Sequence, residues 1–211
     1  MACIGEPLED GERGTGSLGR LLAFSDGVFA IVITILVLDL NVPVGLADAA
    51  LPAALGELTP RLLGAALSFA IIARFWIAHH ALFDHIRSAD RTLLALGTVL
   101  LAPIVLLPFV TELLAEYADT AIAVIAYSVT VVAAALAELA VLAYGTRRRA
   151  LGHRRPAAVR AQLVGAGAAA AAFLVAIPVA LVSPAGAKVC WLLTVVPVGR
   201  LARFGRSRRQ D

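Results

Sequence analysis

Among the polar side chains that interrupt apolar stretches of this 211-residue chain, six are singled out by their chemistry: Ser25, Asp26, Arg74, His79, His80 and Glu138. A charged side chain near the centre of a bilayer costs about 2.5 to 3.5 kcal/mol unless it is paired or hydrated. Such residues are candidates for ion passage or proton sensing. They are equally candidates for a structural role, in which they neutralise one another and fix helix packing.

The depth of these residues follows from the rise of a helix, about 1.5 Å per residue. Asp26, His79 and Glu138 each lie roughly 9 to 14 Å from the arginine-rich end of their apolar run, where they can form one polar layer. Arg74 lies about 20 Å deep and needs a carboxylate or a water-filled crevice, with Glu138 as the expected partner. Adjacent His79 and His80 point about 100° apart, so no metal site is expected there.

The composition requires lipid as a solvent for much of the chain. Hydrophobic residues make up 60% and charged residues 16%, where soluble domains carry about 25% charged residues. Cys3 and Cys190 have no paired spacing, so neither a disulfide nor a metal framework is expected. The acidic, glycine-rich start does not resemble a cleavable signal peptide. We find no nucleotide-binding, metalloprotease or nucleophile-elbow motif, and therefore predict neither an enzyme nor a bound cofactor.

The elements that must position the polar residues are membrane-spanning helices. A span needs about 20 apolar residues, and the continuous apolar runs exclude the alternation of a β-barrel. We predict an all-α integral membrane protein with six spans, the last two separated by a turn at 183–186. The spans are 21–40, 62–86, 93–114, 122–144, 159–182 and 187–201.

The distribution of arginine predicts the orientation. Most of the 18 Lys and Arg residues fall on the side of the N-terminus, which places both termini in the cytoplasm of a multi-pass cell-membrane protein. We expect an acidic cytoplasmic tail at 1–17, a six-helix domain at 18–205 and a basic cytoplasmic tail at 206–211. The basic clusters at 147–160 and in the C-terminal tail are explained by topology and anionic lipids, so nucleic acid is not an expected partner.

One face of the first span carries an aliphatic stripe with a single hydroxyl. Ile31, Thr34, Ile35 and Leu38 fall within roughly 100° of arc, whereas Asp26 points about 140° away from Ile31. Periodicity alone describes the stripe as ordinary lipid-facing or core residues.

The start of this span resembles a known signature. Arg20, Phe24, Ser25 and Asp26, here called the signature residues, form the pattern RxxxFSD. This pattern is similar to the one that opens the first helix of the transmembrane protein 175 family of lysosomal and bacterial potassium channels. Trp76 and His79 in the second span, and residues 107–109 in the third, are also similar to that family. The resemblance extends over roughly residues 18 to 205.

The resemblance implies a homotetramer of six-helix subunits with the first helix lining a central pore. It places Ile31 at the narrowest ring, Ile35 and Leu38 at the next pore-lining positions, and Thr34 at a threonine linked to selectivity. Potassium is then the permeant ion, with a modest preference over sodium because no ring of dipoles replaces lost hydration.

The resemblance also implies that the signature residues hold the first helix against its neighbours through Trp76 and His79. Family members often carry an Asn about a dozen residues before the Pro-Phe pair of the third span. Here the stretch is Ala95, Leu96 and Gly97, so the network around Asp26 is expected to be completed differently.

Two other classes stay open from the residues. A secondary or proton-coupled transporter can use Arg74, Glu138 and the second-span histidines at the midplane. Its weakness is the lack of an evident repeat or of a glycine-interrupted helix pair. A membrane scaffold without transport is the other alternative, and ion flux in liposomes separates the three.

Overall fold

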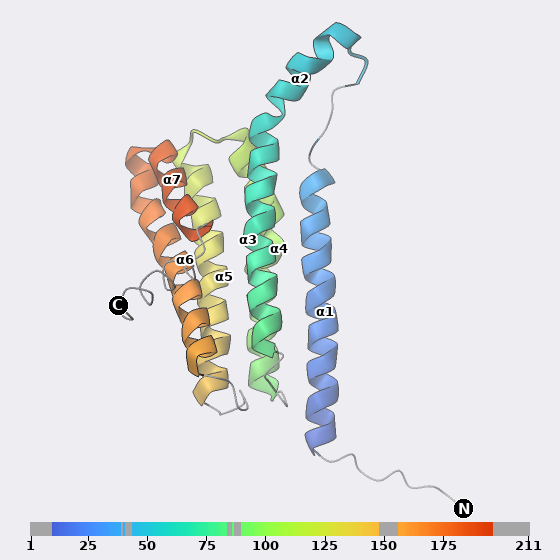
Figure 1. The fold of residues 1–211 in the computed structure, drawn as a ribbon, viewed down its shortest axis with the longest axis vertical. Coiled ribbons are helices and arrows are strands. Elements are labelled where there is room, and N and C mark those ends of the chain that lie inside the picture. The colour runs from blue at the N-terminus through green and yellow to red at the C-terminus, as the bar shows by residue number, and fades with distance from the viewer. Residues whose placement is uncertain are drawn as a thin grey trace, which may run out of the picture.

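The computed structural model describes residues 10–38, 40, 44–83, 86, 90–147 and 156–195. Its regular elements are all helical, as predicted (Figure 1). They are α1 (Asp10–Leu38), η1 (Asp48–Ala50), α2 (Leu51–Glu57), α3 (Thr59–Phe83), α4 (Arg91–Glu116), α5 (Ala121–Arg147), α6 (Pro156–Val182) and α7 (Pro184–Val195).

Five of these helices are long and apolar enough to cross a membrane among the residues described. They are α1, α3, α4, α5 and α6, and each contains most of one predicted span. The sixth predicted span, 187–201, extends beyond the described residues, and the described helix α7 has only 12 residues. Helix α1 begins at Asp10, inside the segment expected to be a tail. The predicted tail at 206–211 lies outside the described residues.

The turn expected at 183–186 is in fact the start of α7. Ser183 Oγ accepts a hydrogen bond from the backbone N–H of Gly186 at 3.0 Å, which is the geometry of a helix N-cap. Pro184 occupies the first helical position, where its fixed φ suits a helix and its missing N–H costs nothing. The Ser-Pro pair therefore begins a helix immediately after α6 ends.

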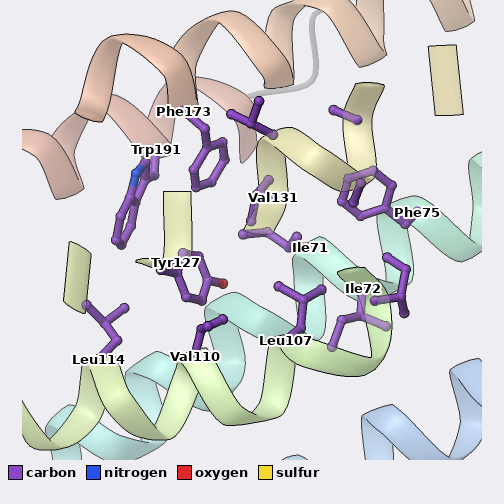
Figure 2. Packing of buried hydrophobic residues seen from close by; sticks show 14 of the residues in the cluster. Ile71, Ile72, Phe75, Leu107, Val110, Leu114, Tyr127, Val131, Phe173 and Trp191 are labelled. Atoms are coloured by element: carbon purple, nitrogen blue, oxygen red, sulfur yellow. The ribbon is translucent and has the colours of Figure 1, made fainter. Parts of the chain in front are cut away.

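The long helices lie side by side, with α1 at one flank and α6 and α7 at the other (Figure 1). Helix α1 packs on α3 and α4, whereas α5 packs on α4 and α6. The main core lies between α3, α4, α5, α6 and α7 (Figure 2), and Phe29, Val32 and Leu36 of α1 join it at its edge. Its aromatic centre is Tyr127, Phe173 and Trp191, whose ring centroids lie 5.0 to 6.2 Å apart.

Small residues occupy several buried positions of α5 and α6, two helices that pack on each other. Ala134 and Ala135 of α5 and Ala176 and Ala180 of α6 are all fully buried. In lipid, where apolar side chains gain little by leaving one apolar medium for another, close packing of small residues is a main source of helix association.

Helix α1 is held by a single seam of side chains. Its buried residues recur at intervals of three or four, which is one face of a helix. They are Leu18, Leu21, Ser25, Phe29, Val32 and Leu36. The seam fits closely against Gly97 of α4, because a Cβ there would lie 2.9 Å from Cδ2 of Leu21 and 3.3 Å from the ring of Phe83.

We predict that Gly97→Ala destabilises the subunit by about 1 to 3 kcal/mol, the usual cost of overpacking a filled site. Gly167→Ala in α6 is the matched control, since a Cβ there meets no atom within 4 Å. Thermal unfolding in detergent compares the two variants. Equal melting temperatures would show that the α1–α4 contact is not close packed.

Candidate functional site

The predicted pore-lining stripe lies on the face of α1 opposite the seam. Side chains of Ile31, Ile35 and Leu38 are 59%, 37% and 73% exposed, and Thr34 is also exposed. No other described part of the chain covers them. A largely aliphatic stripe left uncovered by its own subunit faces lipid, another copy of the chain or a conduction path between copies.

Thr34 differs chemically from its neighbours on the stripe. Its hydroxyl donates a hydrogen bond of 2.8 Å to the carbonyl oxygen of Ile31, one turn earlier on the same helix. With the proton engaged on the backbone, the oxygen presents lone pairs outward. The stripe therefore presents a single side-chain oxygen, that of Thr34, on an otherwise aliphatic surface.

Two of the residues expected to hold α1 in place are joined directly. Trp76 Nε1 of α3 donates to Asp26 Oδ1 of α1 at 3.0 Å. The indole also stacks on the imidazole of His80, with ring centroids 5.7 Å apart. A hydrogen bond to a carboxylate is among the stronger ones, so this contact is a specific tie between α1 and α3.

The other expected supports are placed differently. Ser25 and His79 are fully buried at the α1–α3 contact, and the His79 ring lies 5.7 Å from that of Phe29 and 4.5 Å from that of Phe83. Neither Ser25 Oγ nor either ring nitrogen of His79 has a hydrogen-bond partner among the described residues.

Arg20 and Phe24 are exposed, and Arg20 donates to Ser17 of its own helix at 3.2 Å. Within one subunit the hydrogen bond of Arg20 therefore stays within α1, and more than half of the Phe24 surface is open. Where relatives were expected to carry an Asn in the third span, apolar Leu21 lies against Gly97.

A second polar network lies on the other side of α3. Arg74 Nη1 is 3.5 Å from Glu138 Oε2 of α5, and Glu138 is almost completely buried. The prediction that Glu138 is the partner of Arg74 is confirmed. Arg74 and Trp76 are two residues apart and so point about 200° apart on the helix. The polar residues thus form two networks, one on each side of α3.

Hydroxyl contacts that sequence reasoning missed join α3 to α4 and α5. Ser68 Oγ lies 2.7 Å from Thr111 Oγ1 and 2.9 Å from the Tyr127 hydroxyl. Like the charged residues, they are polar groups inside apolar runs. A hydroxyl costs less to bury than a charge, so its presence in a span is a weaker indication of a specific contact.

Polar contacts between helix ends gather at one end of the bundle. Arg61 at the start of α3 pairs with Glu116 at the end of α4, at 2.7 Å. Lys188 of α7 donates to the carbonyl oxygen of Ala118 at 2.9 Å and lies 3.8 Å from Asp119. This grouping agrees with an up-and-down arrangement of the spans.

Comparison with known proteins identifies the family. Residues 20–108 match the family model described as "Endosomal/lysosomal potassium channel TMEM175". A crystal structure of a lysosomal potassium-selective channel TMEM175 homologue from Chamaesiphon minutus is 30% identical, with a TM-score of 0.71. The match covers 88% of this chain and 98% of that one. The chain belongs to the TMEM175 family. This family is one of ion channels, not of enzymes.

Other TMEM175 relatives match over shorter stretches. A protein named as a potassium channel from Streptomyces collinus is 42% identical over 123 residues, which is 56% of this chain and 60% of that protein. The human "Endosomal/lysosomal proton channel TMEM175" is 45% identical over 91 residues, 39% of this chain and 18% of that protein. The match thus spans no more than 60% of these relatives' length. A structure of the MtTMEM175 potassium channel shares the fold, at 20% identity and a TM-score of 0.59.

We predict that Asp26 and Trp76 are energetically coupled. Asp26→Ala and Trp76→Phe should each destabilise the protein, and the double variant should lose about 1 to 3 kcal/mol less than the sum, since both single changes break one charged hydrogen bond. Unfolding curves in detergent measure the cycle. Arg20→Ala is the control and should have a smaller effect, because its contact lies on the surface of α1. Strictly additive losses would exclude the tie.

Proposed function

We propose that this chain is the subunit of a homotetrameric potassium channel in which each α1 lines a central pore. The observation that carries the proposal is the stripe of Ile31, Thr34, Ile35 and Leu38, left uncovered by the described chain while the opposite face of α1 is buried. Membership of the TMEM175 family and the potassium-channel names of its bacterial relatives support it.

An aliphatic constriction selects ions by the cost of removing water. Four isoleucine side chains around an axis leave an opening whose width decides how much hydration an ion keeps. Potassium sheds water more readily than the smaller sodium ion, so potassium passes preferentially, but modestly, because no ring of carbonyl dipoles replaces the lost water. The same ring can dewet and so act as the gate. Thr34 adds hydroxyl oxygens one turn away.

The proposed topology has six spans in a cell membrane, with both termini in the cytoplasm. An even number of spans is needed to return the C-terminus to the arginine-rich side. Helix α7 is the described part of the sixth span, which we extend to residue 201. Arginines at the cytoplasmic ends then contact anionic lipid headgroups, and no cofactor takes part.

The transporter alternative finds less support. Its proposed substrate-binding groups, Arg74 and Glu138, are paired with each other, and His79 is enclosed by aromatic rings. Because animal relatives are named as proton channels, flux measurements should include a proton gradient beside potassium and sodium gradients. Saturable, substrate-dependent flux would favour a carrier.

We predict that Ile31→Cys and Leu38→Cys cross-link between subunits, in a chain whose Cys3 and Cys190 have been replaced by serine. Oxidation should give covalent dimers, since each subunit then carries one thiol and can form one disulfide, and a permeant thiol reagent should block the current. Leu174→Cys on α6, which is similarly exposed at 49%, is the matched control and should do neither. Labelling of Ile31→Cys by lipid-soluble probes alone would place α1 at the periphery.

We also predict that Ile31→Asn raises the total cation current and lowers the preference for potassium over sodium, because barrier and discrimination come from the same side chains. Thr34→Ala should shift the reversal potential with less than about a twofold change in current, since it removes a hydroxyl and little volume. Ile33→Val is the control, as Ile33 points about 160° away from Ile31. An unchanged reversal potential in Ile31→Asn, with normal protein in the membrane, would remove Ile31 as the filter.

A further inference from the structure

Three polar side chains from three helices meet on the side of α3 that faces away from α1. Glu138 of α5 lies 3.5 Å from Arg74 of α3 and next to Gln162 of α6. Gln162 Nε2 donates to the carbonyl oxygen of Ala78, one turn along α3 from Arg74, at 2.8 Å. The backbone of α6 comes close to the guanidinium, because a Cβ at Gly165 would lie 4.0 Å from Arg74 Nη2.

The polar atoms of this cluster are buried but incompletely bonded. Arg74 Nη1, both carboxylate oxygens of Glu138 and Gln162 Oε1 have no hydrogen-bond partner among the described residues. The separation of 3.5 Å between Arg74 and Glu138 is longer than the 2.7 to 3.2 Å of ordinary hydrogen bonds. Buried charges are costly unless both their neutralisation and their hydrogen bonding are complete. Here Arg74 neutralises the charge of Glu138, but the hydrogen bonding of the cluster is incomplete.

The hydrogen-bonding inventory of the cluster matches a water molecule. It presents one donor, on Arg74, and acceptors on Glu138 and Gln162. A water molecule accepts once from the guanidinium and donates to the carboxylate and to the amide oxygen, which gives the three bonds typical of buried water. A metal cation fits less well, because the positive charge of Arg74 already neutralises the carboxylate and repels a second cation.

The cluster also has a mechanical position. The backbone of α3 packs closely on α1 and α4, whereas the Arg74 side chain links it to α5 and the carbonyl oxygen of Ala78 accepts from Gln162 of α6. On the opposite side of α3, Trp76 bonds to Asp26 of α1. Helix α3 therefore connects this cluster to α1, the helix that carries the aliphatic stripe.

We propose that Arg74, Glu138 and Gln162 hold a buried water molecule and form with it a charge-compensated joint that positions α3 and, through α3, the pore helix α1. The second half of this inference rests on the proposed function. These three are positioning residues: they do not touch the permeating ion, and they act on conduction by fixing where α1 stands.

The first test is structural. A structure of the full assembly at a resolution that shows ordered water should contain one water molecule within about 3.2 Å of Arg74 Nη1, Glu138 and Gln162 Oε1. Side chains that close on one another directly, with no water between them, would overturn the hydrated site.

The second test is a mutant cycle of Arg74→Gln, Glu138→Gln and the double variant, measured in liposomes as potassium current per assembled channel. Each single change leaves one buried charge unmatched and should lower the current roughly tenfold, while the double variant should recover to within roughly threefold of the parent. The reversal potential should stay unchanged throughout. Arg61→Gln, which breaks the more exposed pair with Glu116, is the matched control and should change little.

Several outcomes contradict the joint. Losses that add in the double variant would show that the pair does not act as a unit. A shifted reversal potential would place the cluster in the permeation path. A fall in the amount of assembled protein, with normal current per channel, would reduce it to a folding role.

If a single charge variant does not assemble, Gln162→Met decides the matter, since it keeps the ion pair and the side-chain size and removes the amide. It should lower the current per channel at an unchanged reversal potential, and an unchanged current would overturn the joint. If the parent protein itself carries no current, the proposed function fails. The position of the water molecule, together with the melting temperatures of Arg74→Gln, Glu138→Gln and the double variant, then tests the hydrated ion pair independently of conduction.

Discussion

The cost of leaving a polar group unpaired in lipid shapes this fold more than any other constraint, and α3 is where it is concentrated. Ser68 bonds to Thr111 and Tyr127, Arg74 pairs with Glu138, and Trp76 bonds to Asp26. Lipid tails give apolar helices little reason to prefer one neighbour over another, so directional polar contacts specify which helices meet and at what height. Because residues on more than one face of α3 make these contacts, this helix connects both flanks of the bundle.

The same constraint explains why α1 is attached so differently from the other helices. Its seam is mainly aliphatic and aromatic, and its specific tie is the bond from Trp76 to Asp26. Because only one face of α1 packs on its own subunit, the other face is left for contact with another surface. That arrangement suits the pore-lining role proposed for α1, in which one face contacts its own subunit and the other faces the conduction path.

Hydropathy was enough to predict the five long helices. The free-energy cost of an unpaired charge in the membrane was enough to predict that Arg74 pairs with Glu138. The helix ends were less predictable. Counting apolar residues finds what lies in lipid, not where hydrogen bonding stops, so it missed the start of α1 at Asp10. It also interpreted Ser183 and Pro184 as a turn, although they cap and begin α7. The role of Gln162 depends on which carbonyl it meets, a three-dimensional fact.

The alanines between α5 and α6 have a consequence for the order of assembly. Alanine has no rotamers to lose on burial, whereas Leu, Phe and Val must each give up side-chain freedom when they are enclosed. The buried alanines of α5 and α6, Ala134, Ala135, Ala176 and Ala180, therefore add little to the entropic cost of packing these helices, whereas the Leu, Phe and Val side chains of the α1 seam add more. Among the described long helices, α1 comes before the others in the chain, yet it is the one best suited to dock last, against a surface that the later helices provide.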